Sequence, residues 1–404
     1  MNLKIMMVTG GQLVPSPHDL PVGGAALQAI QLSQALQTRG VHVCIAAPRT
    51  HFRTPPRTMV KGVPVWYVPT LRWLLWRRGL RRIGALVHVA AMTLFLSRYA
   101  CSYDVIHVHS ASLSAVAGVL AGRRLSKPIV IKVMNSGPRN DILLLRTASG
   151  LPGAGSMAAY LRHATRVVAL NRAAIAELQD MGFAREQIVH IPNGVDAVRI
   201  SPITQYRIEG PIRVLYIGRL HPTKGVQTLI AAIALCRQFS SLSQWRLTLV
   251  GDGPQRPILV QQARSLSLTD HVEFVGQVND VVDYLHQAHI FVLPSNSEGI
   301  SNALLEAMAA GLPCVATDNA GNMQVLTHGE DGLMVPVGDE MALAKALVEL
   351  GADEALRARL GRQARRTVER RFHIKRVAEQ YLDLYHQILE ERNARHSLSP
   401  VNNR

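Results

Sequence analysis

Residues 293–317 constrain the fold of this chain more than any other stretch, because they predict a strand, a turn, a helix and a second strand in close succession. The apolar run Ile290–Leu293 is short and is followed directly by a proline, as is typical of a buried parallel strand. Ser301 has the side chain of a helix cap, and residues 303–310 are strong helix formers. A Gly-Leu-Pro sequence at 311–313 ends this helix. The stretch therefore predicts a βαβ unit of an α/β protein.

Two carboxylates mark this unit, Glu298 in the turn and Glu306 inside the helix. In an open parallel sheet, ligands bind beyond the carboxyl ends of the strands, where such turns lie. A helix N-terminus at that edge favours an anion such as phosphate, whereas carboxylates accept hydrogen bonds from hydroxyls. For either glutamate alone, a solvated side chain beside an ordinary helix start would be the simpler interpretation. Together they predict a nucleotide sugar as the ligand.

The pattern Glu-Gly-x5-Leu-Glu-Ala-Met-x-x-Gly-x-Pro, from Glu298 to Pro313, resembles the signature of the retaining GT-B glycosyltransferases of family 4. The resemblance implies two Rossmann-like, doubly wound α/β domains that face each other across a cleft. It also implies transfer of a sugar from a nucleotide diphosphate donor to a hydroxyl, with the anomeric configuration retained. Glu306 would hold the ribose hydroxyls, and Glu298 would hold those of the transferred sugar.

The second half of the chain supplies a candidate diphosphate site. Arg219 and Lys224 lie five residues apart in a turn before a predicted helix from about residue 226. A guanidinium, an ammonium and helix N–H groups that converge on one point suit a diphosphate. In the resembled family the matching Arg and Lys bind the donor phosphates and neutralise the leaving group. The start of the helix after Glu298 would complete the donor-binding set with Gly299, Ile300 and Ser301.

The first half of the chain supplies further candidates. A Gly-rich turn follows the first predicted strand, and the resembled family places this turn near the donor diphosphate, with Gly23 and Gly24 as the matching residues. A later strand ends in His107 and His109. The strand-end position favours His109 as the histidine beside the reacting sugar, because that edge borders the cleft. His107 is the alternative. Arg139, in a later loop, could meet an acceptor phosphate or be a solvated loop residue.

The domain organisation follows from these segments. We expect an acceptor-side domain at 1–200 and a nucleotide-sugar-binding domain at 201–373. A helix over about 374–392 would cross back to the first domain, as the resemblance implies. The polar tail at 393–404 predicts disorder.

No metal or other cofactor is expected. The chain has no Asp-x-Asp pair, which is the usual acidic clamp that holds a metal on a sugar diphosphate. Arg219, Lys224 and the helix dipole at 299–302 would supply the positive charge instead. No side chain is an obvious general base, and in the resembled family the departing phosphate oxygen takes the proton of the acceptor.

The formal net charge of +16, with 44 Lys and Arg against 28 Asp and Glu, favours anionic partners. No zinc-finger, RNA-binding or helix-turn-helix pattern accompanies it, so we expect no nucleic acid. Residues 71–82 combine tryptophans with five arginines, which suits an anionic membrane surface. A solvated basic end of a core helix is the alternative, and the apolar run at 83–96 is predicted to be core.

The four cysteines are far apart in the sequence, and no signal peptide pattern precedes the first strand. These features predict a cytoplasmic protein, peripheral on the inner face of the cytoplasmic membrane.

We therefore expect a glycosyltransferase that uses a UDP-, GDP- or ADP-sugar and a lipid-linked acceptor in polysaccharide biosynthesis. A soluble small-molecule acceptor is the alternative within this class. A nucleotide-sugar epimerase on the same fold and an inactive nucleotide-sugar-binding protein are the alternatives outside it.

Overall fold

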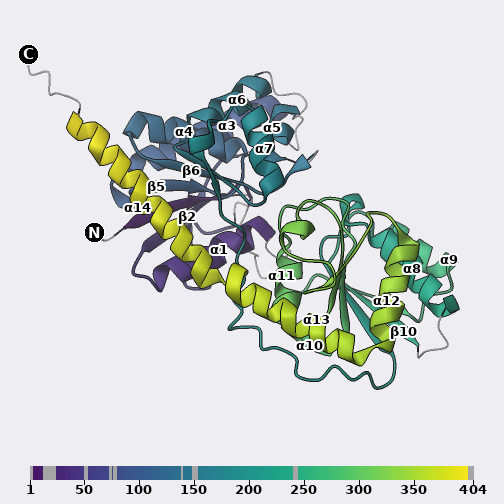
Figure 1. Cartoon of the computed structure of the whole chain (residues 1–404). Helices are drawn as coiled ribbons and strands as arrows, with labels where there is room; N and C mark the ends of the chain where they lie inside the picture. Colours follow the sequence, from purple (N-terminus) through teal and green to yellow (C-terminus); the bar gives the residue numbers. More distant parts are fainter. Residues whose placement is uncertain are drawn as a thin grey trace, which may run out of the picture. The chain divides into compact units, whose positions relative to one another are not determined.

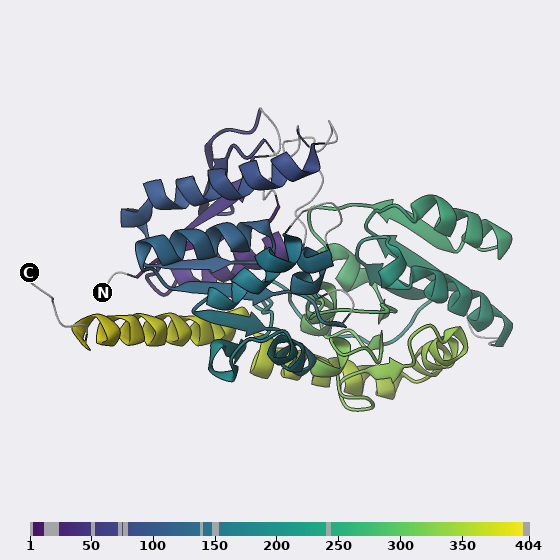
Figure 2. The ribbon, with the colours of Figure 1, turned by 90° about the horizontal axis from the view of Figure 1, so that it is seen from above.

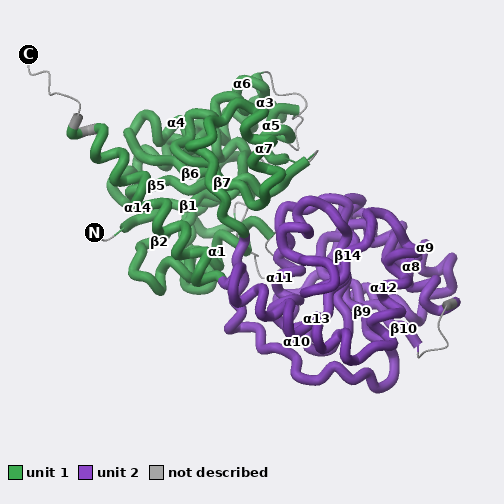
Figure 3. The backbone as a smooth tube through the Cα atoms, viewed as in Figure 1, with its two compact units in different colours: residues 1–192, 374–404 green, residues 193–373 purple. Residues whose placement is uncertain are grey.

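The computed structural model describes residues 3–11, 24–49, 53–71, 75, 80–137, 140–147, 153–239 and 244–398. The chain divides into two compact units, which Figure 3 colours separately. Unit 1 consists of residues 1–192 and 374–404, and unit 2 consists of residues 193–373. The last segment of the chain therefore returns to the unit in which the chain begins.

Unit 1 is built on a sheet with the strand order β3-β4-β2-β1-β5-β6-β7-β8. Neighbouring strands are parallel, except that β3 and β4 form an antiparallel pair. The central strands are short apolar runs that are buried on both faces, as expected where helices cover both sides of a parallel sheet. The strands are β1 (Lys4–Val8), β2 (His42–Pro48), β3 (Arg57–Val60), β4 (Val63–Val68), β5 (Val105–Val108), β6 (Ile129–Val133), β7 (Arg166–Ala169) and β8 (Ile188–His190).

Two sets of helices cover the two faces of this sheet (Figures 1 and 2). On one face α1 (Gly24–Gln37) packs beside the long terminal helix α14 (Ile374–Leu398), and both contribute side chains to one core. The other face has a separate core under the remaining helices of the unit. These are α3 (Arg81–Arg98), α4 (Leu113–Leu125), α5 (Asp141–Thr147), α6 (Ala154–Tyr160) and α7 (Arg172–Asp180).

Helix α3 is only half core, so the prediction that the run at 83–96 is core is wrong for its outer face. Ala85, Met92 and Leu96 are buried against α4 and the sheet. The opposite face leaves large apolar side chains in solvent, namely Ile83, Leu86 and Leu94, with exposed fractions of 50%, 60% and 65%. Because this helix is apolar all round, hydrophobic periodicity could not show which face is buried.

Unit 2 is built on an all-parallel sheet with the strand order β11-β10-β9-β12-β13-β14. The strands β9 and β12, which precede the two candidate ligand turns, are direct neighbours in this order. The strands are β9 (Ile212–Ile217), β10 (Trp245–Val250), β11 (Val272–Gly276), β12 (Ile290–Leu293), β13 (Cys314–Thr317) and β14 (Leu333–Val335).

Side-chain caps begin several helices of unit 2. Asp339 and Asp353 each accept a hydrogen bond from a backbone N–H three residues later, at 2.8 Å in both cases. Ser301 caps α11 through the N–H of Leu304, so the predicted cap is confirmed. The helices are α8 (Val226–Phe239), α9 (Arg256–Ser265), α10 (Val282–Gln287), α11 (Asn302–Ala309), α12 (Glu340–Ala352) and α13 (Glu354–Thr367).

Three boundaries differ from the sequence-based expectations. Residues 193–200 belong to unit 2 rather than to the first domain. The polar stretch at 201–211 contains Pro202 and Gly210 and predicts an interdomain linker. It instead packs on unit 2, because the Tyr206 hydroxyl donates to the Gly311 carbonyl and Arg357 donates to the Tyr206 carbonyl. Residues 393–398 are helical as the end of α14, so the predicted disordered tail is wrong for them.

Some predicted features lie outside the described residues. These are Gly23, Arg139, residues 399–404 and most of the basic segment at 71–82, of which Leu71, Leu75 and residues 80–82 are described.

Candidate active site

Two turns of unit 2 meet at the carboxyl edge of its sheet. The turn after β9 contains a short 3-10 helix, Pro222–Lys224, and ends at Gly225 with a φ of 62°. A Cβ at this glycine would lie 2.0 Å from the carbonyl oxygen of Pro294, so only glycine allows the two turns to approach so closely. The N–H of Asn296 also donates to the Thr223 carbonyl at 2.9 Å. The side chain of Lys224 is thereby placed against the turn after β12.

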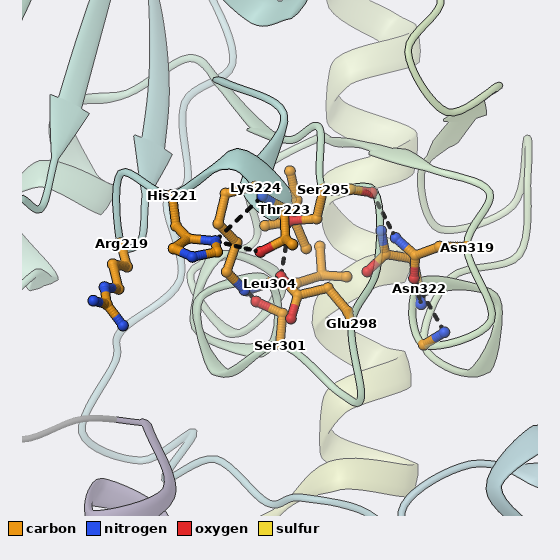
Figure 4. A network of polar contacts seen from close by, with 12 residues as sticks. Arg219, His221, Thr223, Lys224, Ser295, Glu298, Ser301, Leu304, Asn319 and Asn322 are labelled. Carbon is orange, nitrogen blue, oxygen red and sulfur yellow. Dashed lines mark hydrogen bonds and ion pairs between the residues drawn. The ribbon is translucent and has the colours of Figure 1, made fainter. Parts of the chain in front are cut away.

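Lys224 and Glu298 form an ion pair across these two turns (Figure 4). Lys224 Nζ lies 2.5 Å from Glu298 Oε1, and the two residues are 74 positions apart in the sequence. The side chain of Glu298 is 8% exposed and that of Lys224 is 26% exposed. The hydroxyl of Ser295 donates to the same carboxylate oxygen at 2.8 Å. A cation and an acceptor of hydroxyl protons thus lie side by side at the end of the sheet.

A third loop supports the turn that carries Glu298. Asn319 Nδ2 donates to the Ser295 carbonyl at 2.8 Å, and Asn322 Nδ2 donates to the Thr317 carbonyl at 2.9 Å. A Cβ at Gly321 would lie 2.2 Å from the Gly299 carbonyl oxygen, so this loop contacts the turn backbone directly. All four of these polar residues are buried. The position of Glu298 is therefore fixed by the backbone around it.

The turn after β12 continues into α11. Gly299 and Ile300 are buried, and Ser301 is the cap. Asn193 holds this turn from the other side, because its side-chain amide donates to the Ile300 carbonyl at 3.0 Å. The first turn of α11 carries no acidic side chain, so the positive end of its dipole is not neutralised from within the helix.

Glu306 lies inside α11 and is buried, at 6% exposure. Because Glu298 lies in the turn directly before α11, this one helix positions both of the predicted carboxylates.

Arg219 lies at the side of this arrangement. It is exposed, and Figure 4 shows its side chain apart from the Lys224–Glu298 pair, with no contact drawn between them. Its carbonyl accepts a hydrogen bond from the Tyr216 hydroxyl at 3.1 Å. Burial, and to a lesser degree the nearby Glu298 carboxylate, raises the pKa of Tyr216, so the hydroxyl stays protonated as a donor. The turn therefore places Lys224 in contact with Glu298 and leaves Arg219 at its outer edge.

The predicted residues of the first half lie in unit 1. Gly24 begins α1. His109 directly follows β5, is 1% exposed, and stacks on His107 with 4.3 Å between ring centroids. His107 Nδ1 lies 2.6 Å from the hydroxyl of Tyr385 in α14, so His107 is part of the packing between the sheet and this helix. Burial lowers the pKa of both histidines well below the ordinary value, which keeps both rings neutral. The catalytic role of His109 stays a prediction.

A buried lysine lies in the same region and was not predicted. Lys132 of β6 is 1% exposed, and its Nζ lies 5.8 Å from the centroid of the Tyr381 ring. Burial lowers the pKa of Lys132 to about 7. The sequence signal was a single lysine inside the apolar strand Ile129–Val133, where an unpaired charge is costly.

Other residues that hold the site were also missed. Ser295 lies three positions before Glu298, a spacing that suits a local hydrogen bond within a turn. Asn193 belongs to the Pro-Asn-Gly sequence at 192–194, which the expected domain boundary at residue 200 places in the first domain. Among the described residues, no group of three or more His, Cys, Asp or Glu side chains is arranged to hold a metal ion.

Both halves of the chain match families of known proteins. Residues 22–199 match the model described as Glycosyltransferase Family 4, and residues 211–353 match the model described as Glycosyl transferases group 1.

Two relatives and one solved structure illustrate the similarity. The chain is 28% identical over 297 residues to the N-acetyl-alpha-D-glucosaminyl L-malate synthase of Bacillus anthracis. The aligned region covers 71% of this chain and 76% of that protein. It is 28% identical over 390 residues to the phosphatidyl-myo-inositol mannosyltransferase of Mycobacterium leprae, covering 93% and 96% of the two chains. The crystal structure of Anabaena HepE in complex with UDP-glucose is similar with a TM-score of 0.71 and 22% identity, covering 95% of this chain and 99% of that one.

These matches confirm the predicted fold class of two Rossmann-like α/β domains and the predicted enzyme class. Since the two family models together span most of both units, the chain belongs to glycosyltransferase family 4, the group 1 glycosyl transferases, and has the GT-B fold.

Proposed function

We propose that this glycosyltransferase moves a hexose from a nucleoside diphosphate sugar to a hydroxyl of a lipid-linked glycan intermediate in polysaccharide biosynthesis, with the anomeric configuration retained. The observation that carries the donor half of this proposal is the Lys224–Glu298 pair. In this pair the ammonium of Lys224, which we propose binds phosphate, lies 2.5 Å from a carboxylate that can accept hydrogen bonds from sugar hydroxyls. The proposed phosphate-binding group and the proposed sugar-binding group therefore meet in a single contact, where two neighbouring strands of the sheet end.

The proposed roles follow from charge and position. Lys224 and Arg219 bind the diphosphate and stabilise the negative charge that grows on it as the glycosidic bond breaks. The positive end of α11 adds to this field. Glu298 orients the transferred sugar through its hydroxyls, and Glu306 holds the ribose. Because the leaving diphosphate and the transferred sugar are both held by fixed groups, the departing phosphate oxygen can take the acceptor proton on the same face of the sugar.

The proposal of a lipid-linked acceptor rests on a surface of unit 1. The exposed stripe on α3 is formed by Ile83, Leu86 and Leu94, and Arg81 and Arg82 lie at its N-terminal end. The helix has no acidic residue. An exposed apolar helix face with a basic end suits the headgroup region of an anionic membrane, where a lipid-linked acceptor resides. None of the helices in the described ranges combines the length and apolarity needed to cross a bilayer.

The relatives support both classes of acceptor. The mycobacterial relative is a phosphatidyl-myo-inositol mannosyltransferase, and the Bacillus relative is an N-acetyl-alpha-D-glucosaminyl L-malate synthase. The exposed stripe of α3 favours the lipid. We also propose that the protein works as a peripheral protein on the inner face of the cytoplasmic membrane.

Membrane binding is tested by removing the basic end of α3. The double variant R81S/R82S is expected to bind vesicles of anionic phospholipid roughly 10- to 30-fold more weakly than the original chain, because each arginine near such a surface contributes about 1 kcal/mol. The measurement is co-sedimentation with vesicles at physiological salt. The control is R123S/R124S, which removes two adjacent exposed arginines at the end of α4 in the same unit. Equal losses in the two variants would contradict the proposed surface.

The reaction is tested by a thermal-shift screen against UDP-, GDP- and ADP-sugars, followed by mass spectrometry of the products formed on a bacterial lipid extract. UDP-glucose is the first donor to test, because the similar HepE structure contains it. We expect one donor to raise the melting temperature and one lipid-linked glycan to gain a single hexose. Conversion of the sugar nucleotide without any acceptor would indicate an epimerase, and donor binding without turnover would indicate an inactive binding protein.

A further inference from the structure

The ammonium of Lys224 is the main partner of the Glu298 carboxylate, and a bound diphosphate would use the same ammonium. Glu298 Oε1 accepts from both the Lys224 ammonium and the Ser295 hydroxyl. Among the residues that the structure describes, no hydrogen bond reaches Glu298 Oε2. The carboxylate is 8% exposed, so its charge is compensated mainly by Lys224. Any ligand that draws Lys224 away leaves this carboxylate without its main partner.

If Lys224 binds the donor diphosphate as proposed, its contact with Glu298 must weaken when the donor binds. An ammonium has three N–H donors, so Lys224 can reach a phosphate while it stays near Glu298. A diphosphate carries more negative charge than the carboxylate and competes for the same ammonium. It also places a like charge close to Glu298 in a site that is largely shielded from water. Diphosphate binding therefore weakens the contact that keeps Glu298 compensated.

We infer that Lys224 and Glu298 exchange partners when the donor binds, and that this exchange makes Glu298 a specificity residue that favours a nucleotide sugar over the bare nucleoside diphosphate. This inference rests on the proposed function. A nucleotide sugar brings both replacements at once: its diphosphate takes Lys224, and its hydroxyls donate to Glu298 Oε1 and Oε2. A bare nucleoside diphosphate takes Lys224 and supplies no hydroxyl to the carboxylate.

The exchange also serves the end of the reaction. When the sugar has moved to the acceptor, the nucleoside diphosphate remains at Lys224 while Glu298 has lost its hydroxyl donors. The carboxylate then competes again for the ammonium and repels the product phosphates. Product release is favoured by the same residue that orients the sugar, so donor and product are distinguished by one side chain.

The test is the ratio of two dissociation constants, measured by isothermal titration calorimetry with UDP and UDP-glucose, and with the GDP and ADP counterparts if those are the donors that bind. Glu298→Gln keeps the shape and accepts or donates hydrogen bonds, but it has no charge to hold Lys224. We expect this variant to bind UDP about 10-fold more tightly than the original chain, because the ammonium is no longer shared. UDP-glucose should bind no more tightly, so its advantage over UDP should shrink by about 10-fold or more.

Two further variants separate this inference from simpler explanations. Glu306→Gln changes a buried carboxylate that is assigned to the ribose, so it should weaken UDP and UDP-glucose by equal factors and leave the ratio unchanged. In a Lys224→Met background, Glu298→Gln should no longer tighten UDP binding by the same factor. If the gain is as large without Lys224, the effect is general charge repulsion and the exchange is refuted. An unchanged ratio in Glu298→Gln refutes the inference while donor binding upholds the proposed function. No binding of any donor by the original chain refutes both.

Discussion

Replacing Lys224 by Ala is expected to lower kcat at saturating donor by about 10²- to 10³-fold, which is the usual effect of removing one group that stabilises charge in a transition state. The geometry gives the reason. Lys224 is held by the close approach of Gly225 to the Pro294 carbonyl, so its ammonium is aimed at the site before any substrate arrives. Such a preorganised cation needs no rearrangement as negative charge grows on the leaving diphosphate.

The control for this variant is Lys345→Ala, which removes an exposed lysine from α12 in the same unit. We expect it to leave kcat within about twofold, as is usual for a surface change away from the site. Thermal melting of both variants checks the fold, because Lys224→Ala also leaves Glu298 buried without its partner. If the Lys224→Ala protein is folded and its kcat stays within threefold of the original, Lys224 does not stabilise the transition state.

The contact between Lys224 and Glu298 shows where sequence reasoning ends. Each residue was predicted separately, because each lies in a turn that follows a short apolar strand. Their meeting depends on β9 and β12 being neighbours in the sheet, although β10 and β11 lie between them in the chain. It also depends on Gly225, whose positive φ allows the two turns to touch. Neither the strand order nor a close backbone approach between residues about 70 positions apart can be obtained from local patterns.

Unit 1 illustrates a second kind of limit. The strand at 129–133 is β-branched at every position except Lys132, and such a run is typical of a buried parallel strand. Lys132 inside it was passed over, although a lysine in such a run indicates either an exposed edge or a buried amine. Only the packing of α14 on this face decides between the two.

Lys132 is expected to destabilise unit 1 at neutral pH. The residues described around it are His107 on β5, His109 directly after β5, and Tyr381 and Tyr385 on α14, and none of these is a carboxylate. Burial therefore lowers the pKa of Lys132 from 10.5 to about 7 without an opposing carboxylate. In the unfolded chain the same amine regains its ordinary pKa, so unfolding takes up a proton between these two values and becomes easier as pH falls from about 10.5 to 7.

Replacing Lys132 by Met should remove this penalty. At about 1.4 kcal/mol per unit of pKa difference the full effect at pH 7 would be about 4 kcal/mol, and with partial access of water we expect on the order of 3 kcal/mol. For a unit of this size that corresponds to a rise in melting temperature of roughly 6 to 12 °C. The gain should shrink by about 1.4 kcal/mol per pH unit as pH rises from 7 to 9.5, because the folded unit keeps the amine neutral and the release of its proton on folding costs less free energy at higher pH.

The pH dependence distinguishes this explanation from simple improvement of packing. Better packing by methionine would add the same free energy at every pH, whereas removal of a buried amine gives a gain that depends on pH between about 7 and 10.5. Denaturant unfolding of both proteins at pH 7 and 9.5 measures the difference, and Lys4→Met, at an exposed lysine on β1, is the control with no such dependence. His107 and His109 act in a lower window, because their lowered pKa values make the folded unit lose stability only as pH falls below about 6.5. A gain for Lys132→Met that is equal at both pH values would mean that the amine is already well solvated in the folded unit, and that its burial beneath α14 is incomplete.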